Sequence, residues 1–271
     1  MTELYLSLPF RAACTIFTNC RDFRQSLEAK YGMYVRPTAN VNTDLFFSII
    51  REGEKYRFLF PGEETLTAAP LYELDRYLFE HLAFDPQVFA LHGAAVEWRG
   101  ECYIFLAATT SGKTTLTAYL TECGFGYLTD DCVLLDRESF CVYPDAEPIH
   151  LRQGGLEVLA RYESVPDGLQ AIGEAPALRR YVYTPKNTVD KPVPLRRIYF
   201  MERTKDANDL SSLSTNESIA ALMQAPITPY PVTGDYLRFL SRLARVGCYR
   251  LRYSDMAYVK ELIQNEPEPT I

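Results

Sequence analysis

The sequence predicts an α/β protein in which a small mixed α+β region precedes a larger α/β core. Three observations predict this: a hairpin pattern near the N-terminus, short apolar strands that alternate with helices from Phe89 onward, and a lysine-bearing loop between one such strand and one such helix. Of the 271 residues, 47% are hydrophobic and 23% are charged, a balance typical of folded chains. We therefore divide the chain into a small α+β N-terminal region, residues 1–85, and an α/β domain, residues 86–271.

The N-terminal region has the pattern of a hairpin followed by a helix. Residues 43–51 and 55–60 are apolar and aromatic runs on either side of Glu52-Gly53-Glu54, which predicts two paired strands. After Pro70, leucine and tyrosine recur at helical spacing as far as Leu82. This spacing predicts an amphipathic helix that leads into the second region.

The second region alternates between strands and helices. In chain order we expect strands at 94–98 and 103–106, a helix from 113, strands at 133–135 and 195–201, a helix near 236–245, a strand at 249–253 and a last helix capped around Ser254. Between residues 163 and 192 the apolar density falls while prolines and basic residues accumulate. We interpret residues 163–192 as a mobile loop or flap, and leave open whether it closes as a lid.

Charge and composition exclude several classes of function. The chain has 28 basic and 35 acidic residues, a net charge of −7, and no long run of lysine or arginine, so we expect no nucleic-acid partner. No stretch approaches the roughly 20 apolar residues needed to cross a bilayer, and Met1-Thr2-Glu3-Leu4 lacks the basic start of a secretory signal. Seven dispersed cysteines and three histidines show no zinc-site spacing. We expect a cytoplasmic protein without a membrane partner, and leave its oligomeric state open, a homo-oligomer included.

A glycine-lysine loop lies between the strand at 103–106 and the helix that follows. The run from Ala107 to Thr114 fits the pattern GxxxxGK[ST], except that alanine replaces the first glycine. Such a loop turns backbone N–H groups and the positive end of a helix dipole toward phosphate oxygens. Lys113 would hold the β and γ phosphates of ATP or GTP, and the Thr114 hydroxyl is a suitable oxygen ligand for Mg²⁺. The expected nucleotide-binding residues are Ala108, Thr109, Thr110, Ser111, Gly112, Lys113, Thr114 and Thr115.

The helix after the loop is short, and the chain returns to the loop at two aspartates. About ten helical residues climb roughly 15 Å, Gly124 ends the helix, and an extended return covers about 16 Å. This brings Asp130 and Asp131 back to the level of the loop. One carboxylate would act on Mg²⁺, for which we name Asp131, and the other would accept the proton of the acceptor hydroxyl. Because neighbours on a strand point to opposite faces, both can engage the site only if the strand ends or kinks at this pair. A solvent-exposed turn is the alternative.

The run Leu91-His92-Gly93-Ala94, the loop from Ala107 to Thr114, and Leu128-Thr129-Asp130-Asp131 together resemble the catalytic core of bacterial HPr kinase/phosphorylase and the wider group of HPr-kinase-related kinases. The strand that ends at Glu202 and Arg203 also looks like one from that wider group, so the resemblance spans about residues 89–203. It implies that Lys113 and Thr114 bind phosphate and metal, that the aspartate pair is catalytic, and that His92 lies near the phosphates. A buried structural histidine is the alternative for His92.

This chain departs from the bifunctional enzyme in three respects. Its loop lacks that enzyme's acidic and glycine-rich content, no Glu-x-Arg-Gly signature follows the aspartates, and the N-terminal region does not match. We therefore expect neither phosphorylase activity nor HPr as the substrate. Because the wider group resembles kinases of other hydroxyls, the resemblance implies a serine on a ribosomally made peptide of the lasso class, or free serine, as the acceptor.

Four further residues are candidates for phosphate or substrate contacts. Arg152, Arg179 and Arg180 carry planar guanidinium groups that suit phosphate oxygens. Glu202 ends an apolar strand and would add a carboxylate on the metal side, or else pair with Arg203 or Arg197. Two alternatives to a kinase stay open on the sequence alone, namely a nucleotide-binding switch or scaffold without transfer, and a simple nucleoside-triphosphate hydrolase.

Overall fold

The computed structural model describes residues 2–7, 13–32, 34–37, 46–60, 62–81, 85–108, 110–145, 147–172, 179–227 and 230–267. The chain separates into two compact units, Met1–Pro86 and Gln87–Ile271, and each has a hydrophobic core of its own. Both combine helices with sheets, so the α/β class is confirmed. No helix in the described ranges is long and apolar enough to cross a membrane.

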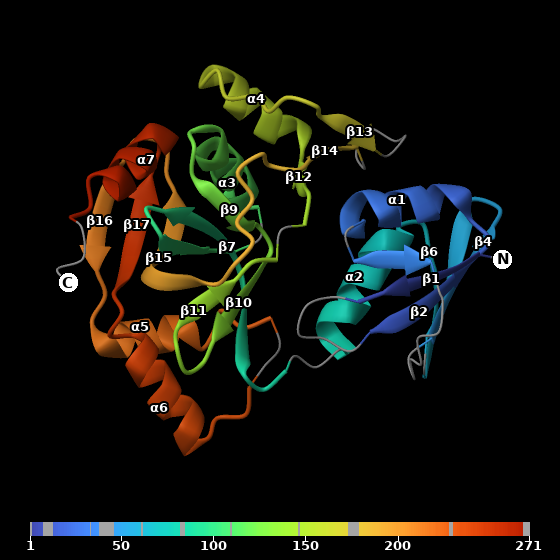
Figure 1. Ribbon diagram of the computed structural model, residues 1–271, viewed down its shortest axis with the longest axis horizontal. Helices are drawn as coiled ribbons and strands as arrows, with labels where there is room; N and C mark the ends of the chain where they lie inside the picture. Colours follow the sequence, from blue (N-terminus) through green and yellow to red (C-terminus); the bar gives the residue numbers. More distant parts are fainter. Residues whose placement is uncertain are drawn as a thin grey trace. The chain divides into compact units, whose positions relative to one another are not determined.

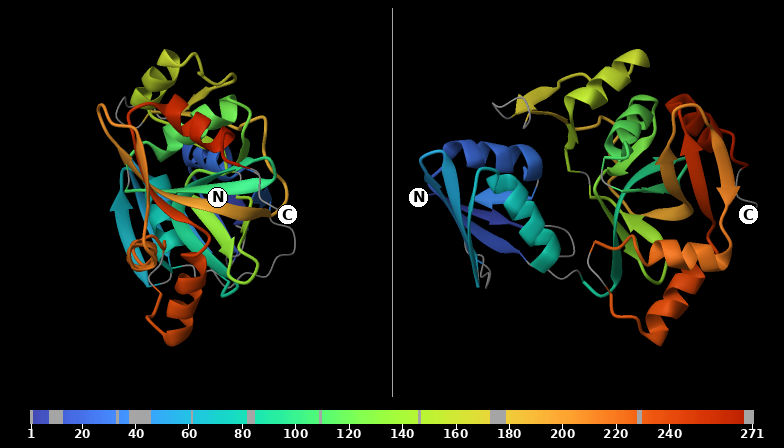
Figure 2. Two further views of the ribbon diagram at one scale, coloured as in Figure 1. Left: turned by 90° about the vertical axis from the view of Figure 1, so that its left-hand side faces the viewer. Right: turned by 180° about the vertical axis from the view of Figure 1, so that it is seen from behind.

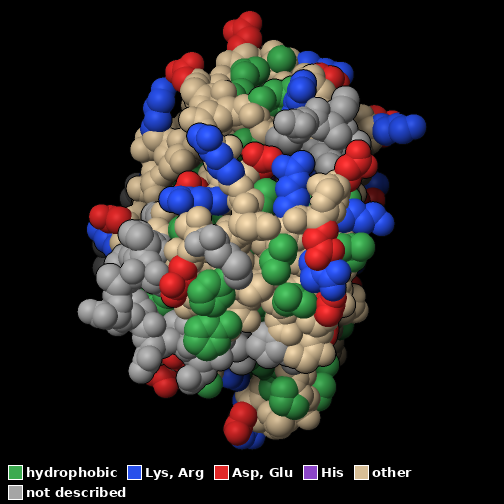
Figure 3. All heavy atoms as spheres, turned by 90° about the vertical axis from the view of Figure 1, so that its right-hand side faces the viewer, with side chains coloured by type: hydrophobic (Ala, Val, Ile, Leu, Met, Phe, Trp, Pro, Cys, Tyr) green, Lys and Arg blue, Asp and Glu red, His purple; other side chains and the backbone are tan. Residues whose placement is uncertain are grey.

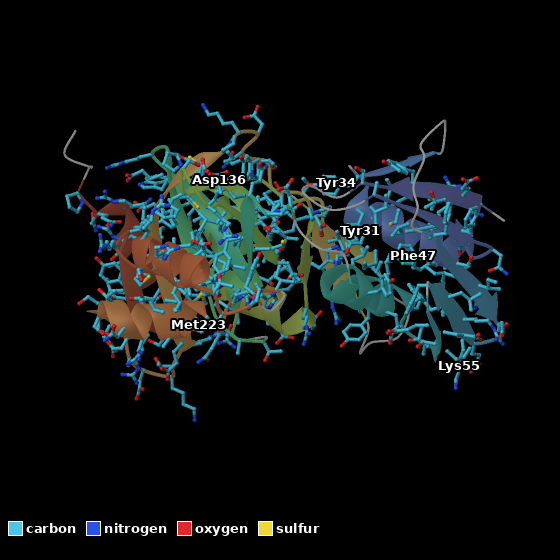
Figure 4. The ribbon with its side chains drawn as sticks, turned by 90° about the horizontal axis from the view of Figure 1, so that it is seen from below. Tyr31, Tyr34, Phe47, Lys55, Asp136 and Met223 are labelled. Atoms are coloured by element: carbon cyan, nitrogen blue, oxygen red, sulfur yellow. The ribbon has the colours of Figure 1, made fainter. Side chains whose placement is uncertain are left out.

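Among its described residues, the first unit has a six-stranded sheet in the order β3-β1-β2-β4-β5-β6 and two helices. Its elements are β1 Thr2–Leu6, β2 Cys14–Thr18, α1 Arg21–Tyr31, β3 Val35–Pro37, β4 Phe46–Glu52, β5 Lys55–Phe60, β6 Glu63–Thr67 and α2 Pro70–His81. The predicted hairpin is confirmed by β4 and β5, whose turn has Gly53 at φ 62°. Phe47 is fully buried in the core, whereas Lys55 lies at the exposed turn (Figure 4). The helix predicted after Pro70 is confirmed as α2.

The second unit is built on an eight-stranded sheet. Its strands are β7 Val88–Trp98, β8 Glu101–Leu106, β9 Gly126–Thr129, β10 Cys132–Asp136, β11 Cys141–Tyr143, β15 Val193–Arg203, β16 Asp209–Ser212 and β17 Cys248–Tyr253. They follow the order β11-β10-β7-β8-β15-β17-β16, and β9 also pairs with β7. The pairs β8–β15 and β15–β17 are parallel and the others are antiparallel. The three parallel strands therefore end at one common edge.

Helices cover this sheet on both faces, because strand residues alternate between two separate apolar clusters. The helices are α3 Lys113–Glu122, α4 Gln153–Arg161, α5 Thr215–Leu222, α6 Gly234–Leu243 and α7 Met256–Gln264. One cluster contains α3, α4 and α7, and the other contains α5 and α6, as the ribbon views show (Figures 1 and 2). The last helix begins after Asp255, whose carboxylate accepts from the Ala257 N–H, rather than after Ser254.

We interpret residues 163–192 from the sequence as a loop or flap, and the described parts of this segment, 163–172 and 179–192, contain two short strands. They are β13 Gln170–Ile172 and β14 Arg180–Tyr183, which form a three-stranded sheet with β12 Ile149–Leu151. Val182 and Tyr183 are buried, so part of this segment is packed rather than free. Strands of three or four residues are too short to show a clear period, which is why the prolines and basic residues dominated the pattern.

Charged side chains of both signs are mixed on the face shown in Figure 3, where basic and acidic groups lie next to one another. Some of the closest ion pairs of the first unit join residues on neighbouring strands, such as Arg57 with Glu52 and with Glu64. These contacts lie at the surface, where an ion pair contributes little to stability.

Candidate active site

The loop between β8 and α3 takes the tight form that its sequence predicts. Gly112 precedes α3 in the left-handed conformation at φ 97°, and Thr110 also has a positive φ, 69°. The Ser111 hydroxyl donates to the Ala108 carbonyl over 2.6 Å. The first N–H groups of a helix have no carbonyl one turn back, so this loop opens onto free donors at the start of α3. Thr109 lies outside the described residues.

Lys113, the first residue of α3, is buried with 6% of its surface exposed. Its ammonium donates to the carbonyls of Ala107 at 2.8 Å and Ala108 at 3.3 Å, which holds it over the loop. Burial lowers the pKa of Lys113, and the charges of Asp131 and Asp130 oppose that shift. Both carboxylates are therefore close enough to Lys113 to favour its charged form.

The chain returns from α3 to the loop at the aspartate pair. The helix ends before Gly124, which has φ 94°, and β9 then runs to Thr129. Strands β9 and β10 both pair with β7, but Asp130 and Asp131 interrupt them. The Thr129 hydroxyl accepts from the N–H groups of Asp131, at 3.4 Å, and Cys132, at 3.3 Å. The break that both carboxylates require to face one site is thus present.

His92 lies between the lysine and the second aspartate. Its Nε2 is 3.4 Å from Lys113 Nζ, and its Nδ1 is 3.6 Å from Asp131 Oδ1. Because an ammonium only donates, Nε2 is the accepting nitrogen and the ring proton lies on Nδ1, toward Asp131. Burial, followed by the charge of Lys113, lowers the pKa of His92, which favours this neutral form.

Asp130 is held differently from Asp131. It is half-buried and faces the hydroxyl of Tyr127 at 3.3 Å, and that hydroxyl also donates to the Glu147 carbonyl over 2.7 Å. The Asp131 side chain is 52% exposed. The two neighbouring carboxylates thus differ in their access to solvent and in their partners.

Three of the remaining candidates lie around the start of α4. Gly155 packs on α3, the helix that follows the loop of residues 107–112, which we call the phosphate loop. A β-carbon built on Gly155 would lie 3.0 Å from the Thr115 hydroxyl oxygen. The β12–β14 register places Arg152 level with Arg180, and the pKa of Arg180 is lowered by burial and then by Arg152. Arg180 also donates to the carbonyl of Arg179, which is exposed. Arg152 and Arg180 are therefore neighbours, and Arg152 precedes Gly155 by three residues, about one helical turn.

Glu202 does not pair with Arg203 or Arg197, the partners that the sequence suggested. Its carboxylate is 3.7 Å from Arg252 on β17. In β15, Tyr199 and Met201 pack in the cluster that contains α3, while Ile198 packs in the other cluster. Strand alternation therefore places Glu202 on the face away from α3 and the next residue, Arg203, on the face of α3.

Arg203 lies near the loop, and the sequence did not single it out as a site residue. A β-carbon built on Gly112 would lie 3.8 Å from Arg203 Cδ and 3.9 Å from its Nη1. The available signal was weak, namely a charged residue directly after an apolar strand. Its position depends on the parallel β8–β15 register, which no local pattern reveals.

The oxygen donors at the site suit Mg²⁺ bound together with a nucleotide. Thr114, the second residue of α3, carries a hydroxyl, and the two aspartate carboxylates lie near enough to act on Lys113 of the same loop. Mg²⁺ in such sites takes one or two carboxylates and completes its shell with phosphate oxygens and water. Within the described ranges, no group of three or more His, Cys, Asp and Glu side chains is arranged to hold a metal by itself.

No protein-family model matches the chain, and no curated protein matches it in sequence. Among solved structures, the chain is similar to the Hpr(Ser) kinase/phosphatase from Coxiella burnetii, with 10% sequence identity and a TM-score of 0.35. The similarity covers 65% of this chain and 94% of that one. A likeness this distant carries no inference about chemistry, so the function has to be inferred from the site itself.

Proposed function

We propose that this protein is a phosphotransferase that uses ATP or GTP with Mg²⁺ and transfers the γ-phosphoryl group to a hydroxyl. One observation carries the proposal: His92 lies 3.4 Å from the phosphate-loop Lys113 and 3.6 Å from Asp131. A triphosphate on the loop would therefore have its terminal end beside a carboxylate that can act on the acceptor. This arrangement provides what transfer requires, which is a grip on the phosphates next to a base.

Each residue of the site has a defined task in this proposal. The loop N–H groups and Lys113 bind and orient the phosphate chain, and the Thr114 hydroxyl with one aspartate holds the metal. Mg²⁺, when bound, supplies charge that offsets the negative charge of the phosphates. The other aspartate takes the proton of the attacking hydroxyl. Neutral His92 accepts from Lys113 and directs its Nδ1 proton toward Asp131, which fixes the orientation of both.

For the acceptor we propose a serine-type hydroxyl, on a ribosomally made peptide of the lasso-precursor type or on free serine. The support is the sequence resemblance to the wider group of HPr-kinase-related kinases. Arg152 and Arg180 supply cationic groups near the start of α4 that would contact phosphate or an anionic part of the acceptor. We place this activity in the cytoplasm.

The proposal is tested by incubating the protein with Mg·ATP or Mg·GTP and a panel of precursor peptides and free serine. Mass spectrometry of the acceptor should show a gain of one phosphoryl group. Phosphate release without an acceptor product would instead indicate a hydrolase.

Three variants separate transfer from binding alone. We expect Lys113→Ala to lose both nucleotide binding and transfer. We expect Asp130→Asn and Asp131→Asn to keep nucleotide binding and to lose transfer, by about 10²- to 10⁴-fold for whichever is the base. If both aspartate variants retain the cellular function of the protein while Lys113→Ala abolishes it, the protein is a nucleotide-dependent switch or scaffold.

A further inference from the structure

Three chain segments meet at one edge of the sheet in the second unit. Strands β8, β15 and β17 are parallel neighbours, with Phe200 opposite Leu106 and Arg203 opposite Tyr253. The phosphate loop follows Leu106, so the ends of β15 and β17 lie beside it. The carboxyl ends of parallel strands are where α/β sheets bind their ligands.

Arg203 and Tyr253 both point at the glycine of the loop. A β-carbon built on Gly112 would lie 3.4 Å from the Tyr253 hydroxyl oxygen and 3.9 Å from Arg203 Nη1. Gly112 is constrained by its left-handed φ of 97°, and these two side chains lie at ordinary contact distance in front of it. A cation and a hydroxyl donor thus lie directly against the loop.

Neither group is used elsewhere in the described part of the chain. Arg203 makes no hydrogen bond or ion pair there, although the other arginines of β15 do, since Arg196 and Arg197 pair with Glu266. Tyr253 is only 2% exposed, and its hydroxyl also has no hydrogen-bond partner among the described residues. The Tyr253 hydroxyl oxygen is not one of the fully buried side-chain atoms without a partner in the described part of the chain, so it remains accessible and can donate to a bound anion.

The position of Arg203 in the sheet also indicates which phosphates of a bound nucleotide it would contact. Strand β8 lies between β7 and β15 in the sheet, so the loop that follows β8 has His92 of β7 on one side and Arg203 of β15 on the other. The aspartate pair lies on the β7 side. The terminal phosphate has to be near these carboxylates, which leaves the other phosphates for the β15 side.

We propose that Arg203 and the Tyr253 hydroxyl form a second phosphate-binding position, which holds the α and β phosphates that stay with the nucleoside. This inference rests on the proposed nucleotide binding but not on phosphoryl transfer. In this arrangement Lys113 faces the terminal phosphate, which reacts, whereas Arg203 binds the diphosphate part, which is the leaving group. Arg203 then contributes equally to the binding of triphosphate and diphosphate.

The test is direct binding of Mg·ATP and Mg·ADP to the full chain by calorimetry, with wild type, Arg203→Ala and Arg203→Lys. A lost charge-assisted contact should weaken binding of both nucleotides to Arg203→Ala by about tenfold or more. Arg203→Lys should fall between, because lysine keeps the charge without the planar fork. In the acceptor assay, the KM for nucleotide should rise while kcat changes little, as for an interaction made equally in ground and transition states.

Arg252→Ala is the matched control, because Arg252 lies on the next strand and is paired with Glu202 and Asp209. It should bind both nucleotides like wild type. Both variants should melt near the wild-type temperature, because Arg203 is exposed and Arg252 is partly exposed with ion pairs at the surface. Arg203→Ala with binding within twofold of wild type overturns the inference, and so does a loss of ATP affinity alone, which would assign Arg203 to the terminal phosphate.

If wild type binds nucleotide without transferring phosphate, the proposed function fails and the Arg203 site stands. If wild type binds no nucleotide, both fail.

Discussion

At the scale of single residues, Gly93 controls how closely β7 approaches the strand that carries the phosphate loop. A β-carbon built on Gly93 would lie 2.6 Å from Leu106 Cδ2 and 2.9 Å from the Phe105 carbonyl oxygen. The second atom belongs to the β8 backbone, so the clash cannot be relieved by turning a side chain. Gly93 also donates its N–H to the Asp131 carbonyl over 3.3 Å, which ties the aspartate pair to β7.

We therefore expect Gly93→Ala to destabilise the protein by about 1–3 kcal/mol, as overpacking does in a close-packed core. It should also reduce transfer more than nucleotide binding, because it displaces Asp131 relative to the loop. Chemical denaturation gives the first quantity, and the acceptor assay with direct nucleotide binding gives the second.

Gly154→Ala serves as the control for this change. Gly154 lies in α4, and a β-carbon built there meets nothing within 4 Å. This variant should be neutral or more stable by up to about 1 kcal/mol, because alanine is the better helix former. Equal stability of the two variants would contradict the close approach at Gly93.

The site residues that the sequence predicts are those whose positions depend on local chain geometry. A strand, a glycine-lysine loop and a short helix with a direct return are enough to bring Lys113 and the aspartate pair together. Arg203 lies 91 positions after Gly112 in the chain and reaches the same loop through strand pairing. Glu202 and Arg203 look alike in sequence, and only the sheet decides which of them faces α3.

At the scale of elements, the hairpin of β10 and β11 is organised by one carboxylate. Asp136 accepts from the Ser139 N–H and hydroxyl, both at 2.8 Å, and from the Glu138 N–H at 3.1 Å (Asp136 is labelled in Figure 4). These hydrogen bonds, first the one from the Ser139 backbone, lower the pKa of Asp136. The charged carboxylate is therefore the form that stabilises the turn.

The sign of the pH dependence follows from this shift. Asp136 is charged in the folded state at pH values where it would already be protonated in the unfolded chain, so its contribution is present above the ordinary aspartate pKa of about 3.9 and is lost as the pH falls through the lower folded value. Asp136→Asn keeps an acceptor oxygen but removes the titration. Wild type should be the more stable protein at pH 7, and the difference in melting temperature should shrink below about pH 4. Melting curves from pH 7 to pH 2.5 that stay parallel would contradict this role.

The sequence predicted the elements in which a hydrophobic pattern continues over several residues, such as the helix α2 and the β4–β5 hairpin. Strands β13 and β14 were missed because each spans only three or four residues and gains its order from pairing with β12 and from the burial of Val182 and Tyr183. The cap of α7 differs by one residue from the prediction, because Ser254 and Asp255 are both good capping residues and the contact of Asp255 with the Tyr162 hydroxyl favours the second.

At the scale of the whole molecule, the chain has two units whose cores are separate. The buried residues of Met1–Pro86 form one cluster, and those of Gln87–Ile271 form two clusters on either face of one sheet. Every residue that we assign to nucleotide binding lies in the second unit. A unit with a complete sheet, helices on both faces and about 185 residues is large enough to be stable alone.

We therefore expect a fragment of residues 87–271 to fold cooperatively and to bind Mg·ATP with the affinity of the full chain. The same substitutions should act on it in the same way, with Lys113→Ala abolishing binding and Arg252→Ala leaving it unchanged. Calorimetry gives both the unfolding transition and the nucleotide affinity.

A folded fragment that binds nucleotide but no longer modifies the acceptor would assign acceptor recognition to residues 1–86, whereas one that retains transfer would place the whole reaction in the second unit. A fragment that folds but binds no nucleotide would contradict the assignment of the site to this unit.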